Sequence, residues 1–80
     1  MNEYEHKVKW CPVCDQGWVE IVKDSSKQQI YLYCNECETE WINPNNIRRD
    51  NGTQDIFQTC ENVTLTEIEK KGWEDYLIKE

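Results

Sequence analysis

The sequence predicts a small metal-stabilised α+β fold with three antiparallel strands, followed by a short C-terminal helix and tail. Three observations lead to this prediction. The chain has only 80 residues, four of its five cysteines form two Cys-x2-Cys pairs, and short runs rich in β-branched and aromatic residues follow or precede each pair. A chain of this length buries only about 60–65% of its unfolded surface, so a metal ion or disulfides usually supply the missing stability.

The three expected strands alternate with the cysteine pairs. They comprise residues 18–22, 29–33 and 39–42. The polar stretch 23–27 is typical of a turn and joins the first two strands as a hairpin. A hairpin of this kind brings the two cysteine pairs to the same end of the sheet. The charged residues 1–9 form a lead-in, as a tail or a short strand.

The last part of the chain predicts one short helix, at about residues 65–71. Thr64 and Glu67 have the spacing of a capping box, in which each side chain binds the backbone N–H of the other residue, and Thr66 and Glu69 offer a competing register. Lys70 and Lys71 place positive charge near the expected C-terminus of the helix, and Gly72 is suited to end it.

The two cysteine pairs are the strongest indication of chemistry in the chain. Nineteen residues separate Cys14 from Cys34, within the gap of about 15–20 that is typical of paired zinc-binding turns. Two thiolates on one tight turn can reach an ion at about 2.3 Å, and a second turn completes a tetrahedron. Such a closed site leaves no position for water, so it is structural. The predicted ligands of one structural Zn²⁺ are Cys11, Cys14, Cys34 and Cys37.

The same cysteines could serve chemistry other than zinc binding. Redox-active pairs of the thioredoxin type would need a βαβ pattern, which the sequence lacks. Disulfides are uncommon in cytosolic proteins. Iron can occupy four thiolates as well as zinc can and stays open as an alternative, although zinc is favoured.

The segments 11–17 and 33–41 resemble zinc ribbons with the pattern CPxCGxG…CxxC…W, as found in small bacterial proteins. The resemblance covers residues 10–42 and implies a zinc ribbon with one metal. Asp15 and Glu38 stand where such ribbons commonly have glycine, so we expect a looser turn after each pair. The chain is therefore divided into a lead-in (1–9), a zinc ribbon (10–42) and a C-terminal extension (43–80) packed on the ribbon as one domain.

The charge balance indicates the class of partner. Sixteen acidic and nine basic residues give a formal charge of −7, and four thiolates with Zn²⁺ would make it about −9. This excess disfavours direct binding to nucleic-acid phosphates or to an anionic membrane, and it suits a basic partner. Neither a signal peptide nor an apolar run of about 18 residues is evident, so a cytoplasmic protein is expected, as a monomer or weak dimer.

These observations predict a non-enzymatic protein that binds a basic protein partner. In size, charge and layout the chain is similar to immunity proteins that neutralise nuclease toxins. A zinc-ribbon module in transcription or RNA metabolism is the alternative. The candidate partner-binding residues are acidic: Asp15, Glu36, Glu38, Glu40, Glu74 and Asp75.

Catalysis is not expected, because no Ser/His/Asp set and no open metal site is evident. The sole histidine, His6, is expected on a solvent-exposed tail. Cys60, the unpaired cysteine, is expected to be a small buried side chain, with a reactive thiol or an alternative metal ligand as the other interpretations.

Overall fold

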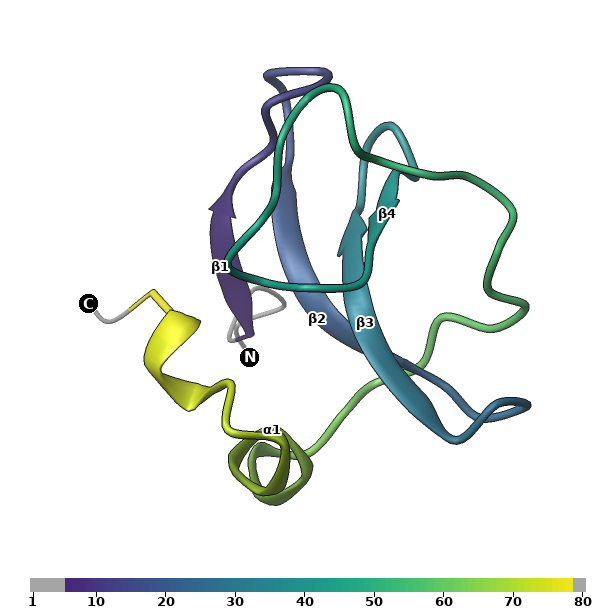
Figure 1. The fold of residues 1–80 in the computed structure, drawn as a ribbon, viewed down its shortest axis with the longest axis vertical. Helices are drawn as coiled ribbons and strands as arrows, with labels where there is room; N and C mark the ends of the chain where they lie inside the picture. Colours follow the sequence, from purple (N-terminus) through teal and green to yellow (C-terminus); the bar gives the residue numbers. More distant parts are fainter. Residues whose placement is uncertain (1–5, 79–80) are drawn as a thin grey trace.

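A computed structural model describes residues 6–78 and shows one antiparallel sheet in the order β1-β2-β3-β4, with a helix packed against it (Figure 1). Residues 1–5 of the predicted lead-in and 79–80 of the extension lie outside the described residues. The elements are β1 (Lys7–Trp10), β2 (Trp18–Asp24), β3 (Gln29–Cys34), β4 (Glu40–Trp41), α1 (Leu65–Lys71) and the 3₁₀ helix η1 (Glu74–Tyr76).

The sheet has four strands, so the prediction of three is wrong by one. The additional strand is β1, in which Lys9 pairs with Val19 and Trp10 with Trp18. Its four residues, KVKW, alternate charged and apolar side chains, but the run is short, lies at the edge of the sheet and has an irregular register between Lys7 and Lys9. At the other edge, β4 has two residues and is shorter than the predicted strand 39–42.

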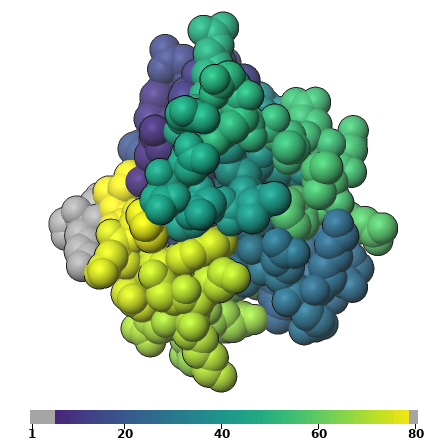
Figure 2. Space-filling view, in the orientation of Figure 1, coloured from purple at the N-terminus to yellow at the C-terminus, as the bar shows by residue number. Residues whose placement is uncertain are grey.

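The main hydrophobic core lies on one side of the sheet, which we call the core face. Side chains alternate between the two sides of a strand, so Ile21 and its partner Leu32 point to the same side. Chain segments around residue 45 and beyond residue 65 cover the side of the sheet turned to the viewer in Figure 2. The buried residues of this core include Val19, Ile21, Leu32, Trp41, Ile47, Val63, Ile68 and Trp73.

Helix α1 begins at the predicted capping box and ends before Gly72. The backbone N–H of Glu67 donates to Thr64 Oγ1 (3.2 Å), and the N–H of Thr64 donates to Glu67 Oε1 (3.1 Å). Gly72 has φ = +80°, the left-handed conformation that ends many helices. Ile68 is fully buried against the core face. Within residues 6–78, no helix reaches the length and apolarity that crossing a bilayer requires.

An ion pair fixes the helix to the sheet. Lys23 Nζ lies 2.7 Å from Glu67 Oε2, joining β2 to the first turn of α1. This hydrogen bond, with the one from the Thr64 backbone, lowers the pKa of Glu67 to about 2. The carboxylate therefore serves the helix cap and the sheet contact together.

Residues 53–61, which we call the crossing segment, traverse the side of the sheet opposite the core face (Figure 1). The segment begins with Thr53 paired to Glu40 of β4 and ends with Glu61 paired to Lys23 of β2. Between these bridges it forms no helix or strand. The Phe57 ring stacks on Tyr31 of β3, with centroids 3.8 Å apart and planes 4° from parallel, which anchors its middle.

Asp24, the last residue of β2, binds the crossing segment through a fully buried carboxylate. It accepts hydrogen bonds from the Ser26 hydroxyl (2.6 Å), the Gln58 N–H (2.9 Å) and the Thr59 hydroxyl (3.1 Å). The Ser26 hydroxyl, followed by the Gln58 N–H, holds the pKa of Asp24 well below its ordinary value in spite of burial. The carboxylate is thus kept ionised by neutral donors.

Glu40 of β4 binds the preceding residues of the crossing segment in the same way. Its carboxylate accepts the N–H groups of Ile56 (3.1 Å) and Phe57 (3.3 Å). With Gln58 bound to Asp24, three consecutive N–H groups donate to two buried carboxylates. These bonds satisfy backbone donors that have no strand partner in this irregular segment.

Candidate metal centre

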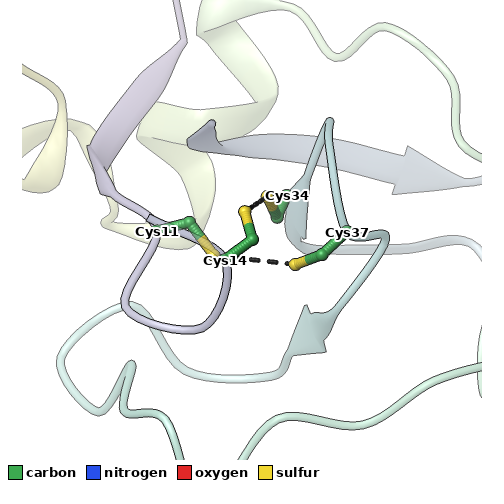
Figure 3. Close-up of side chains that lie close together, drawn as sticks. All are labelled: Cys11, Cys14, Cys34 and Cys37. Atoms are coloured by element: carbon green, nitrogen blue, oxygen red, sulfur yellow. Dashed lines mark hydrogen bonds between the residues drawn. The ribbon is translucent and has the colours of Figure 1, made fainter. Parts of the chain in front are cut away.

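Four cysteines meet at one end of the sheet, from two loops far apart in the sequence (Figure 3). Cys11 and Cys14 lie in the loop between β1 and β2, and Cys34 and Cys37 lie at the end of β3 and just beyond it. We call these two loops the first and second knuckle. Since β2 and β3 form a hairpin, both knuckles lie at the end opposite α1 (Figure 1).

The sulfur atoms have the spacing of metal ligands. All four Sγ atoms lie within 4.8 Å of one another. The Sγ–Sγ distances are 3.7 Å for Cys11–Cys37 and 3.6 Å for Cys14–Cys34. Ligands at about 2.3 Å on a tetrahedron would be about 3.8 Å apart, whereas a disulfide needs about 2.05 Å. The four cysteines could therefore hold one metal ion, as in a zinc ribbon.

The two knuckles repeat the same local hydrogen bonding. The N–H of Val13 donates to Cys11 Sγ, and the N–H of Glu36 donates to Cys34 Sγ, both at 3.4 Å. In each case the donor is two residues after the accepting cysteine. These N–H dipoles favour the negative thiolate that a metal ligand must be.

The expectation of looser turns after the cysteine pairs is wrong. Asp15 and Glu38 have φ of 55° and 62°, the left-handed conformation that glycine adopts without strain. Their N–H groups close both turns by donating to the carbonyls of Cys11 (3.2 Å) and Cys34 (3.0 Å). Asp15 also accepts the indole N–H of Trp10 at 2.6 Å, so a polar contact accompanies its strained backbone.

Gly17 is needed for space, because the two knuckles pack together at this point. A Cβ at Gly17 would lie 2.6 Å from Glu36 Cγ and 2.8 Å from Asn35 Oδ1. Those atoms belong to side chains of the second knuckle, so a larger residue at 17 would force Asn35 and Glu36 to shift. Glycine here serves close approach, and the positive φ belongs to its neighbour Asp15.

Burial and hydrogen bonding give the thiols different acidities. Burial raises the pKa of Cys34, which is fully buried, to about 12. Cys37 is half-buried; burial raises its pKa, but hydrogen bonds from the Thr39 side chain and backbone outweigh this and bring it to about 7. The hydroxyl of Thr39 is 3.1 Å from Cys37 Sγ. Sequence reasoning missed Thr39, since a threonine two residues after a cysteine pair carries no distinctive signal.

With all four positions supplied by thiolates, the centre leaves no place for water or substrate on a tetrahedral ion. The ion would join the β1–β2 loop to the β3–β4 loop, with Cys11 and Cys34 forming part of the buried core. A bound ion would therefore act as a cross-link between the two loops.

The structure separates the six acidic residues predicted to bind a partner. Asp15, Glu36 and Glu38 are exposed on the knuckles. Glu40 is wrongly included in that surface, because it is 4% exposed and binds the crossing segment. The remaining two, Glu74 and Asp75, belong to η1 near the start of β1, at the end of the sheet opposite the knuckles.

Two further expectations need correction. Cys60 is exposed rather than buried, and it lies outside the four-cysteine group. His6 is half-buried rather than on an exposed tail, and with Leu65 and Leu77 it lines a cavity of about 640 Å³ beside α1. Neither residue is placed to ligate the metal.

No protein family matches the chain, and neither curated proteins nor solved structures show significant similarity to it.

Proposed function

We propose that this protein is a non-enzymatic binding module whose knuckle end, held by one structural zinc ion, recognises a basic protein partner. One observation carries the proposal. The knuckle segments 11–18 and 34–41 contain four acidic residues and no lysine or arginine. Three of these acidic side chains are exposed around the metal centre.

The metal would add to this negative end of the molecule. Four thiolates and Zn²⁺ carry a net charge of −2, which adds to the −4 of the carboxylates in the two knuckle segments. Charge of one sign concentrated at one end steers an oppositely charged partner toward it and raises the association rate. Phosphate groups would be repelled from the same surface.

Zinc is the ion proposed because the donor set consists of four thiolates at tetrahedral spacing. An immunity protein that neutralises a basic nuclease is the specific form of this function that we favour, in view of the small size and the charge of −7. Such a protein would bind its toxin with an association rate that falls as salt increases.

The test compares two probes on the zinc-loaded protein: a fluorescent lysine- and arginine-rich peptide, and a labelled single-stranded RNA. We expect the peptide to bind, its affinity to fall as salt rises, and Glu36→Gln to weaken binding about two- to fivefold. The matched control is Glu69→Gln, which removes an exposed carboxylate from α1, away from the knuckles.

Two results would overturn the proposal. One is RNA binding at moderate salt that equals or exceeds peptide binding, which would favour the transcription or RNA module. The other is an equal loss of peptide affinity in Glu36→Gln and Glu69→Gln, which would show that overall charge, rather than the knuckle end, attracts the peptide.

A further inference from the structure

A small pocket lies between the second knuckle and the crossing segment, on the side of the sheet opposite the core face. Its volume is about 140 Å³. Three aromatic residues line it: Tyr31 stacks on Phe57, and Tyr33 meets Tyr31 edge-on with ring centroids 6.3 Å apart. The π faces of such rings attract cations.

One ring of this group already attracts a cation within the chain. Lys27 Nζ lies 5.2 Å from the centroid of Phe57 and donates to the Ile56 carbonyl. Lys27 itself is not among the residues that line the pocket. The structure therefore already contains one cation–π contact to this aromatic group, made from outside the pocket.

Three carboxylates also line the pocket: Glu38, Glu40 and Asp55. Glu40 is 4% exposed, and its hydrogen-bond donors are neutral N–H and hydroxyl groups of the crossing segment. Glu38 and Asp55 are exposed. Among residues 6–78, neither ion pair found in the structure involves any of these three carboxylates. A buried carboxylate with two more beside it and no cation is a site that a positive group would stabilise.

We infer that this pocket receives the guanidinium group of an arginine from the basic partner, an inference that rests on the proposed function. Its volume is well below the roughly 300–1,000 Å³ of small-molecule sites and suits the end of one long side chain. The pocket adjoins the knuckle end because Glu38 belongs to the second knuckle. It would convert general attraction between charges into recognition of one residue.

Arginine fits this lining better than lysine does. The guanidinium is planar, so it can stack on Tyr33 while its N–H groups donate to carboxylates at the rim. A lysine ammonium is a compact and more strongly hydrated charge, which gains less from a flat aromatic wall. The exposed sulfur of Cys60, also in the lining, adds a polarisable contact without a charge.

The experiment titrates the zinc-loaded protein with N-acetyl-arginine amide and follows backbone amide shifts by NMR. The lysine and citrulline amides serve as comparisons, since citrulline keeps the shape of arginine and lacks its charge. We expect shifts centred on Tyr33, Phe57 and Cys60, with affinity for arginine at least threefold above lysine and tenfold above citrulline.

Variants then locate the binding. Glu38→Gln and Tyr33→Leu should each weaken arginine binding at least threefold. Glu69→Gln is the matched control: it removes an exposed carboxylate from α1, outside the pocket, so it should change the affinity less than twofold.

The outcomes separate this inference from the proposed function. If arginine and citrulline bind alike, or if Glu69→Gln matches Glu38→Gln, the pocket is not an arginine site, although the basic peptide can still bind the knuckle end. If lysine binds as tightly as arginine, the guanidinium preference is wrong. If the arginine amide binds in the pocket while the basic peptide binds no better than RNA, the inference stands and the proposed function fails.

Discussion

The knuckle end and the crossing segment are both irregular chain, but different groups hold them in place. At the knuckle end, four cysteine sulfur atoms converge to within 4.8 Å. In the crossing segment, three consecutive N–H groups donate to the buried carboxylates of Asp24 and Glu40. A metal would hold the knuckle end by coordination to its cysteines. Carboxylate oxygen atoms hold the crossing segment by hydrogen bonds.

A small chain can in this way order more residues than its core covers. Thiolate ligation binds loops to each other and, through an ion, can contribute on the order of 10–16 kcal/mol. Carboxylate–amide bonds contribute much less each, but they satisfy backbone groups directly and need no cofactor. We therefore expect the knuckle end to control whether the protein folds, and the carboxylates to control how well the crossing segment is fixed.

Loss of the metal should have the largest effect. Removing zinc with a chelator, or changing the buried ligand in Cys34→Ser, should abolish cooperative thermal unfolding, because the thin core cannot replace the coordination energy. Circular dichroism during melting, together with metal analysis of the purified protein, provides the measurement. A cooperative transition in the chelated protein would contradict a structural role for the centre.

Asp24→Asn should have the next largest effect, since an amide offers one acceptor and places an NH₂ group against the donors that Asp24 binds. We expect the melting temperature to fall by about 10 °C and the Gln58 amide to exchange faster, while the zinc content stays at one per chain. Asp50→Asn is the control, because Asp50 is exposed and pairs at 3.5 Å with the exposed Arg48. Equal destabilisation by Asp24→Asn and Asp50→Asn would show that the buried hydrogen bonds of Asp24 add no particular stability.

The ion pair between β2 and α1 should give a smaller, pH-dependent effect. The pKa of Glu67 in the folded protein is about 2, below its ordinary value of 4.5. Its contribution to stability is therefore complete above pH 4.5 and is lost as the pH falls toward 2. Acid also protonates the thiolate ligands and releases the metal, so the titration is followed only above about pH 4. Carboxyl-carbon NMR of the zinc-loaded protein should show Glu67 still ionised there, and Lys23→Gln should bring the start of its titration into this range. A titration curve of Lys23→Gln identical to that of the unchanged protein would show that the helix cap alone lowers the pKa.

The smallest effect should come from the backbone of the knuckles themselves. Glu38→Gly should raise the free energy of unfolding by about 0.5 kcal/mol, because it relieves the left-handed strain at φ = 62° against the entropic cost of glycine. Asp15→Gly should give no gain, since it also removes the hydrogen bond from Trp10. Denaturant unfolding of the zinc-loaded variants measures both. A greater stabilisation by Asp15→Gly would reverse this ranking.

The cysteine cluster and the short helix could be predicted because their signals are local. Each cysteine pair spans four residues, and a hairpin of ordinary length lies between the pairs. The capping box also lies within four residues, from Thr64 to Glu67. In these cases the residues that interact are close enough in sequence for their spacing to imply a geometry.

The crossing segment and β1 could not be predicted in the same way. Asp24 binds Gln58 from 34 positions away, and nothing near Asp24 in the sequence distinguishes it from an ordinary turn residue. Glu40 looks like part of an acidic surface run, but the alternation of β4 turns it toward the crossing segment. The strand β1 is only four residues long and depends on pairing with β2 at an edge, where the register between Lys7 and Lys9 is irregular.

The crossing segment also limits how strands of other molecules can pair with this sheet. Open sheet edges invite strands of other molecules to pair with them, a common route to aggregation. Here Thr53 pairs with Glu40 at one side of the sheet, and Glu61 pairs with Lys23 on the part of β2 beyond the reach of β1. The N–H of Ile78 donates to the Lys7 carbonyl on β1 itself. The chain thus covers part of each sheet edge with its own segments, which leaves less free edge for pairing with a strand of another molecule.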